Sequence, residues 1–130
     1  MDPWFPTHHT RDIYISLLSM EPPAARPILI AALLRRAMTD VSRIMVVRDS
    51  KNALQTLLAK GQIGDDTWNH LLETEKELEA ELMEVVGEAN TWRQGWGQII
   101  FAHANDMVQH EKHQKVWREI ESEKERFREC

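Results

Sequence analysis

The chain has 130 residues and a formal net charge of −5, which is enough for one domain with a modest core. Apolar residues make up 42% and charged residues 28%, as in a folded chain rather than a disordered one. Residues 1–60 carry 8 Lys and Arg against 5 Asp and Glu, whereas residues 61–130 carry 8 against 16. The acidic second half argues against nucleic acid as the main ligand, because phosphates need clustered basic residues.

Cysteine usage and hydropathy limit the cellular setting. The single cysteine, Cys130, allows no disulfide within the chain, which suits a reducing compartment. The longest apolar run, residues 28–34, ends at Arg35 and is too short to span a bilayer. The first residues lack the apolar core of a signal peptide. The sequence as given therefore predicts neither a membrane span nor a leader.

The first ten residues predict an extended arm, because Pro3 and Pro6 disfavour a helix. The arm carries the aromatic pair Trp4 and Phe5, which either folds back onto the chain's own core or anchors a partner. His8 and His9 are expected to be mobile and solvated. We expect the arm to span residues 1–10 and a single helical domain to span residues 11–130.

Three helices are predicted after the arm, separated by helix-breaking or helix-capping residues. Thr10 is placed to cap the first helix, residues 11–19. The second begins at Pro27, since the first helical turn tolerates the missing N–H of proline. Ser50 is placed to cap a third, residues 51–60, which ends at Gly61 in a left-handed turn.

A longer helix follows, from Asp65 and Asp66 to about residue 92. Either aspartate can cap the helix, and apolar residues then recur at three-and-four spacing. Its other face holds a column of glutamates, which is either solvated or opposed by the arginines of the second helix: Glu73, Glu77, Glu81, Glu84 and Glu88. Glu75 lies inside the apolar stripe, so we expect a basic group or a backbone donor beside it.

The last predicted helix runs from about Gln98 to residue 129. Its first half is apolar enough to pack, but its second half has few large apolar residues among many charges, so it either bridges between bodies or frays. No strand or repeat signal is comparable. The fold class predicted is all-α, with about five helices, two of them long and amphipathic, wrapping around a partner.

Candidate chemistry is sparse. His110 and His113 share a helix with Glu111, but no third ligand lies at a recognisable spacing. No phosphate-binding loop or nucleophile motif is present. We therefore predict no catalytic residue, no metal, no cofactor and no enzymatic activity. A metal hydrolase built on the two histidines remains an alternative, as does a self-associating helical protein.

The order of several short segments resembles the fungal Sec seventy-one family, also called Sec sixty-six, over about residues 4–112. The segments that carry this resemblance are residues 11–17, 32–38, 40–41, 53–54, 57–58, 60–66, 75–79, 88–90, 95–98 and 100–101. Acidic, glycine and tryptophan positions in one order make the match more specific than any single motif. No pattern extends beyond about Lys112.

The resemblance implies a subunit of the endoplasmic-reticulum complex that moves finished polypeptides through the Sec translocon. Members pair with a small tetratricopeptide-repeat subunit, Sec seventy-two, which receives cytosolic chaperones of the seventy-kilodalton heat-shock class, and the pair attaches to Sec sixty-three. The family's membrane helix is absent from this sequence, so the resemblance implies the part at the cytosolic face of the endoplasmic-reticulum membrane. The implied role is a scaffold that holds the chaperone-docking subunit.

Large aromatic and apolar side chains are the expected partner contacts, since such residues concentrate binding energy. The alternative for the interior tryptophans is ordinary core packing. The residues expected to contact the partner are Trp4, Phe5, Ile13, Tyr14, Trp92, Trp96 and Trp117.

Overall fold

The computed structural model describes residues 2–129, which form helices and no strand. The elements in chain order are α1 (His9–Ser19), α2 (Arg26–Ala59), α3 (Asp65–Trp92), a short 3₁₀ helix η1 (Trp96–Gln98) and α4 (Ile100–Glu129). The all-α prediction is confirmed, including its long helices. Within residues 2–129, each helix is too short or too polar to span a bilayer.

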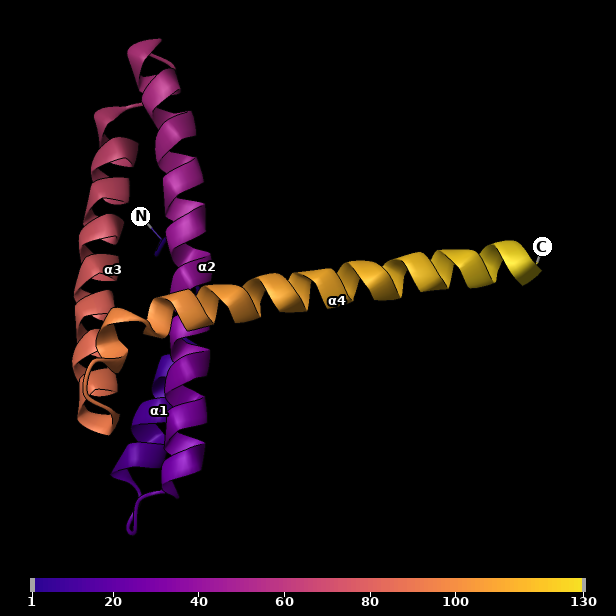
Figure 1. Ribbon diagram of the computed structural model, residues 1–130. Helices are drawn as coiled ribbons and strands as arrows, with labels where there is room; N and C mark the ends of the chain where they lie inside the picture. Colours follow the sequence, from indigo (N-terminus) through magenta and orange to yellow (C-terminus); the bar gives the residue numbers. More distant parts are fainter. Residues whose placement is uncertain (1, 130) are drawn as a thin grey trace.

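Helices α2 and α3 run side by side in opposite directions and form the spine of the molecule (Figure 1). With 34 and 28 residues, they are about 51 and 42 Å long at ~1.5 Å per residue. Helix α1 packs beside the first half of α2, and α4 crosses α2 and then extends away from it (Figure 1). We call residues 9–109, which contain α1, α2, α3, η1 and the first part of α4, the body.

Two apolar clusters hold the body together. The larger cluster joins all four helices and consists of Tyr14, Leu29, Leu33, Ala37, Met38, Val41, Val85, Ala89, Ile100, Ala104 and Val108. The smaller cluster lies between the second half of α2 and the first half of α3 and contains Val47, Leu71 and Leu78. Trp4 and Phe5 pack against it, so the arm folds back onto the chain's own core.

Helix α2 is continuous, so the break predicted at Ser50 is wrong. Residues 46–53 contain neither glycine nor proline, and a serine alone does not stop a helix whose neighbours continue to pack. Val47 is buried and Leu54 packs on the same cluster, which keeps both sides of Ser50 against α3. The start near Pro27 is confirmed, as is Gly61, which adopts φ +71° just after α2.

Two predicted caps are also wrong. His8, not Thr10, caps α1, because its ring nitrogen accepts the backbone N–H of Arg11. Gly64 is the N-cap of α3 and no side chain caps it, although Asp65 and Asp66 occupy the first turn, where the helix dipole favours them. Helix α1 therefore begins two residues earlier than expected, and α3 begins where predicted.

Candidate functional site

The first candidate site is a buried charge network where the arm, α1, α2 and α3 meet. Arg36 and Asp40 lie one turn apart on α2 and are both 0% exposed. Arg36 donates from Nε and Nη2 to the two carboxylate oxygens of Glu81 at 2.6 and 2.8 Å. Its Nη2 also lies 3.2 Å from Glu84. This paired geometry allows the guanidinium to remain charged inside the protein.

His8 connects the arm to this network. Its Nδ1 accepts the backbone N–H of Arg11 at 3.1 Å, so the proton of the neutral ring is on Nε2. Nε2 then donates to Asp40 Oδ1 at 2.7 Å. The expectation that His8 is mobile and solvated is therefore wrong: its side chain is 10% exposed and bonded on both sides.

The charge network shifts three pKa values in different directions. Burial, only partly offset by the hydrogen bond from His8, raises the pKa of Asp40 to about 6. Burial would also raise the pKa of Glu81, but the hydrogen bonds and charge of Arg36 outweigh it and hold that pKa below its usual range. Burial opposes the charge of Arg36, yet Glu81 and Glu84 raise its pKa. At neutral pH the network thus holds a strong Arg36–Glu81 ion pair beside Asp40, whose ionised form is disfavoured by burial.

The ligand atoms of His8, Asp40 and Glu81 lie within 4.8 Å of one another, as metal ligands do. However, Arg36 occupies both oxygens of Glu81, and Arg11 Nε lies 3.4 Å from one of them. Two guanidinium groups already supply the positive charge that a cation would bring. The arrangement therefore fits a structural ion-pair network better than a metal centre.

A second polar link joins α1 to the end of α3. Tyr14 is 1% exposed, donates to Glu88 at 2.6 Å and accepts the indole N–H of Trp92 at 3.0 Å. Burial and the hydrogen bond to Glu88 raise the pKa of Tyr14 to about 12. Arg26 also donates to the backbone carbonyl of Trp92 at 2.7 Å. This end of the body is thus held by polar contacts as well as by apolar packing.

The glutamate column of α3 is opposed by other elements over part of its length. Glu81 and Glu84 meet Arg36 and Arg11, and Glu88 meets Tyr14. The alternative in which basic groups lie opposite the column is therefore correct for Glu81 and Glu84, whereas Glu88 accepts a hydrogen bond from a phenol. The donor expected beside Glu75 is also confirmed, since Lys51 Nζ lies 3.0 Å from its carboxylate.

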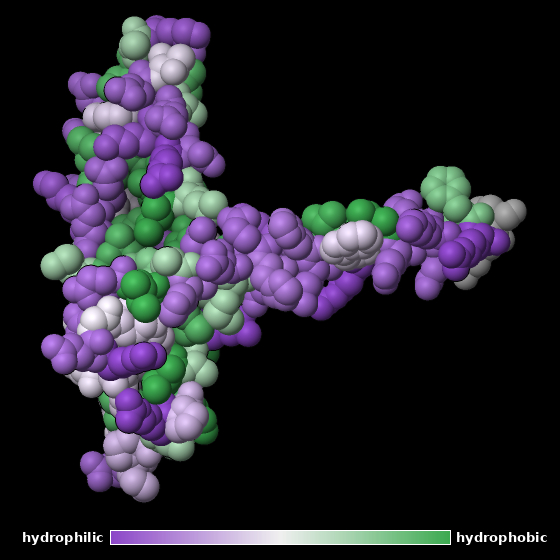
Figure 2. Space-filling model, in the orientation of Figure 1, coloured by the Kyte–Doolittle hydropathy of each residue, from purple (hydrophilic) through white to green (hydrophobic). Residues whose placement is uncertain are grey.

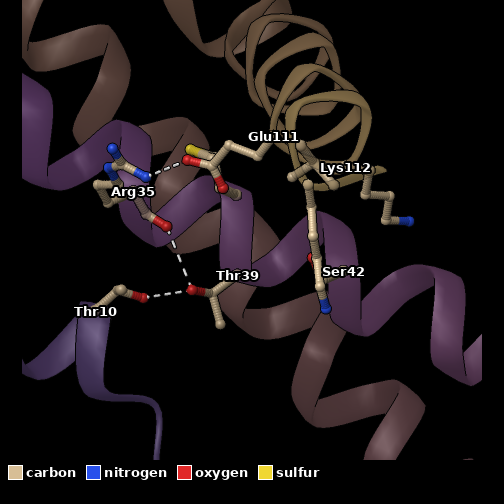
Figure 3. Close-up of a pocket in the computed structure, with 9 residues that line it drawn as sticks. Thr10, Arg35, Thr39, Ser42, Glu111 and Lys112 are labelled. Carbon is tan, nitrogen blue, oxygen red and sulfur yellow. Dashed lines mark hydrogen bonds and ion pairs between the residues drawn. The ribbon is translucent and has the colours of Figure 1, made fainter. Parts of the chain in front are cut away.

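A shallow groove of about 390 Å³ lies where α4 crosses α2. Figure 3 shows Arg35 of α2 meeting Glu111 of α4, at 2.7 Å, and Thr10 meeting Thr39. Thr39 also donates to the backbone carbonyl of Arg35. The Arg35–Glu111 ion pair thus lies where α4 leaves the body, and the Thr10–Thr39 hydrogen bond joins α1 to α2 beside it.

The expected partner contacts have very different surroundings. Ile13 is 54% exposed and Trp117 is 62% exposed, so both are open to another protein. Tyr14 is buried and cannot touch a partner in this conformation. The remaining four are half-buried, two against the smaller cluster and two against the larger: Trp4, Phe5, Trp92 and Trp96.

The buried network was not predicted from the sequence, because the arginines of the second helix were considered only as one of two possible environments of the glutamate column. A signal was available: Leu33, Ala37 and Val41 define the apolar stripe of α2, and Arg36 and Asp40 fall beside them at helical spacing. The histidines of α4 are exposed, as expected, and His110 Nε2 lies 3.0 Å from Nε2 of Gln114, a hydrogen bond within the same helix.

Comparison with known proteins supplies the family. The whole chain, residues 1–130, matches the family described as "Preprotein translocase subunit Sec66". The chain belongs to this family. It is 39% identical over 109 residues to a curated protein of Schizosaccharomyces pombe named "Translocation protein sec66". The match covers 84% of this chain and 57% of that relative, so the chain spans little more than half its length.

A solved structure supports the same fold. The matched chain comes from "Cryo-EM structure of the Sec complex from S. cerevisiae, wild-type, class without Sec62", with a TM-score of 0.74. The match covers 89% of this chain and 86% of that chain at 24% sequence identity. The crossed-helix architecture is thus shared with a chain in a Sec complex, and the family resemblance noted in the sequence is confirmed by the family match.

Proposed function

We propose that this chain is a non-catalytic scaffold subunit of endoplasmic-reticulum post-translational translocation. In this role it holds a chaperone-docking tetratricopeptide-repeat subunit close to the Sec translocon, on the cytosolic face of the membrane. Membership of the family of preprotein translocase subunits supports the setting. The observation that carries the scaffold role is the amount of large apolar surface left exposed on a body that already has a closed core.

Six large apolar side chains on the body are more than 40% exposed. They are Ile13, Met20, Ile28, Val46, Met83 and Ile99. The body buries its own clusters without them, so covering them requires another surface. Single exposed apolar residues are common, but three of these six lie in α1, the following turn and the first residues of α2. We propose that this region contributes to the contact with the repeat subunit.

The long α2–α3 pair suits a scaffold for a second reason. A groove of about 420 Å³ runs between α2 and α3, on a part of the spine lined by Ile44, Val47, Leu78 and Leu82. The ion pair between Lys51 and Glu75 lies in its wall. Arg48, Asn52 and Glu79 also line the groove, so its surface is partly apolar and partly charged, a mixture that protein–protein interfaces also show.

Among the expected contacts, we propose Ile13 as the primary one and Trp4, Phe5, Trp92 and Trp96 as secondary ones. Ile13 is exposed and its loss leaves the core intact. The four aromatic residues also pack within the body, so their substitution affects folding as well as binding. Trp117 belongs to α4, beyond the residues that pack on the body, and is 62% exposed.

Co-expression with the repeat subunit, followed by gel filtration, tests the proposal. We expect a stable one-to-one complex, and Ile13→Glu should weaken it about tenfold or more while leaving the unfolding transition unchanged. Met83→Glu is the matched control, since Met83 is 72% exposed on α3 and lies outside the proposed contact region of α1, the following turn and the first residues of α2. Failure of the wild-type chains to form a complex would refute the scaffold role. A complex sensitive to Met83→Glu and not to Ile13→Glu would move the contact to α3.

A further inference from the structure

The second half of α4 leaves the body without covering its own apolar side chains. Every residue from His110 to Arg128 is exposed, and we call residues 112–129 the projecting segment. Its large apolar residues are Val116, Trp117, Ile120 and Phe127, which are 51%, 62%, 41% and 81% exposed. Figure 2 shows apolar atoms gathered along one edge of this rod, among charged neighbours.

The spacing of these residues is that of a short coiled coil. Val116 and Ile120 are four apart and Ile120 and Phe127 seven apart, so all three lie on one side of the helix. In a heptad, Ile120 and Phe127 take the first position and Val116 the fourth. Trp117 and Lys124 then flank the seam on one side, and Glu119 and Arg126 flank it on the other. These are the positions that select a partner helix.

We propose that the projecting segment pairs with the same segment of a second copy of this chain, in antiparallel orientation. The register that packs Val116 against Phe127 of the second copy also sets Glu119 opposite Arg126 of that copy. The same register sets Trp117 opposite Lys124, an arrangement suited to a cation–π contact. Because the pairing has two-fold symmetry, each of these contacts forms twice. The charge pattern of the segment is therefore complementary to itself.

Glu123 favours the antiparallel orientation over the parallel one. It occupies the fourth heptad position, so a parallel pair would place it against the same carboxylate of the second copy, which costs free energy. In the antiparallel pair it faces Ile120 instead. Its charge is already compensated within the helix, where Arg126 Nη1 lies 3.3 Å from its carboxylate.

The length of the segment also fits this register. Arg128 of one copy lies level with Lys115 of the other, which lines the groove where α4 joins the body. The overlap covers residues 115–128, about 21 Å of helix at ~1.5 Å per residue. The two bodies then sit at opposite ends of the paired rods. So small an interface predicts a weak dimer, with a dissociation constant of about tens of micromolar.

Charge exchange tests the pairing directly. The full chain is studied by sedimentation equilibrium from about 5 to about 200 µM, under reducing conditions so that Cys130 cannot cross-link copies. Glu119→Arg and Arg126→Glu should each raise the dissociation constant about tenfold, because each sets two like-charged pairs across the seam. An equimolar mixture of the two variants should associate as well as the wild type, since every pair is then of opposite charge.

Glu125→Arg is the matched control. It makes the same change of charge in the same segment, but on the side of the helix away from Val116 and Ile120, so association should be unchanged. Helicity measured by circular dichroism confirms that each variant is folded. The pairing of two copies does not depend on the repeat subunit. The test of pairing alters residues of the projecting segment, whereas the test with the repeat subunit alters Ile13 and Met83.

Three results would overturn the proposal. A wild-type chain that stays monomeric over the whole range would show that the segment does not pair with itself. A dimer unaffected by Glu119→Arg and Arg126→Glu would place the interface elsewhere. Rescue of Glu119→Arg by Lys124→Glu, and not by Arg126→Glu, would show a parallel pair, since parallel packing brings residue 119 against residue 124.

Discussion

Helix α3 and the projecting segment of α4 are both rich in charge, yet their charges have different surroundings. In α3, Glu81 and Glu84 meet Arg36 and Arg11 from other helices, and Glu88 meets Tyr14. In the projecting segment, the one ion pair found among the described residues joins Arg126 to Glu123 on the same helix. The carboxylates of α3 support folding because basic side chains of α1 and α2 pair with them. The charged side chains of the projecting segment remain available to pair with another protein.

The largest change in stability should follow when the buried, positively charged side chain that faces α3 is removed. Arg36→Met leaves Glu81 and Glu84 without their main partner inside the body, which should lower the free energy of unfolding by about 3–5 kcal/mol. Arg35→Met is the control, since Arg35 is 58% exposed and its pair with Glu111 is a surface one, expected to contribute less than about 1 kcal/mol. Urea unfolding measures both. Equal losses would mean that burial does not strengthen the Arg36 pair.

A smaller loss of stability should follow from adding a side-chain atom where η1 packs closely against α3. A Cβ on Gly97 would lie 2.7 Å from the backbone oxygen of Val86 and from the side chain of Asn90. Asn90 Oδ1 also accepts the Gly97 N–H at 2.9 Å. We expect Gly97→Ala to destabilise the protein by about 2 kcal/mol, because backbone must move.

Gly87 provides the control for that substitution. A Cβ at Gly87 meets nothing within 4 Å, and the residue is exposed within α3. Gly87→Ala should therefore stabilise the protein by about 0.5–1 kcal/mol through its better helix propensity. Thermal unfolding of both variants measures whether each substitution raises or lowers stability. If both substitutions stabilise the protein, η1 is not packed against α3 in solution.

The buried carboxylate of Asp40 should make the stability of the body depend on pH. Because the pKa of Asp40 is raised from 3.8 to about 6, the folded state binds its proton more tightly than the unfolded state. The Asp40 contribution is therefore present at about pH 4 and is lost as the pH rises through 6. It is worth at most about 2–3 kcal/mol, since one pKa unit corresponds to ~1.4 kcal/mol.

Asp40→Asn isolates this contribution, since the amide cannot ionise. The difference in unfolding free energy between the wild type and the variant should change between pH 4 and 7, with the wild type losing stability relative to Asp40→Asn as the pH rises. Glu81 acts in the opposite sense, because its lowered pKa means that stability falls on acidification, but it is present in both proteins. A difference independent of pH would show that Asp40 is not the group that titrates.

The smallest effect should come from removing the projecting segment after Lys112. A chain that ends at Lys112 keeps both apolar clusters, and every residue removed from 113 to 128 is exposed. Its unfolding free energy at low protein concentration should lie within about 0.5 kcal/mol of the full chain. A larger loss, measured by urea unfolding, would mean that this segment is part of the folded body.

Much of the architecture could be predicted from residue patterns, and the failures have a common origin. Pro27, Gly61 and the Asp65–Asp66 pair mark helix ends through local backbone chemistry, and the structure confirms each end. Ser50 has the same local chemistry, yet packing of Val47 and Leu54 against α3 keeps the helix continuous. A cap signal is worth about 1 kcal/mol, which burial of two apolar side chains exceeds.

The candidate site could be predicted only in part. The basic neighbour of Glu75 followed from its place in an apolar stripe, and Lys51 fills that role. Ile13 and Trp117 were expected at a surface and are exposed, whereas Tyr14 is internal. The sequence of a single helix does not show whether an aromatic residue packs within the chain or contacts another protein. Both kinds of contact use the same apolar face of the helix.

By itself the sequence determined that this protein is helical, where most helices begin and end, and which family it resembles, because these depend on residues close together in the chain. Only the tertiary structure decided that Arg36 and Asp40 are buried, that His8 is bound, and that α4 extends from the body. Those outcomes depend on charges brought together from distant positions, such as Arg36 and Glu81, 45 residues apart. Whether a charged side chain is buried depends on the group opposite it, and spacing along one helix carries no information about that group.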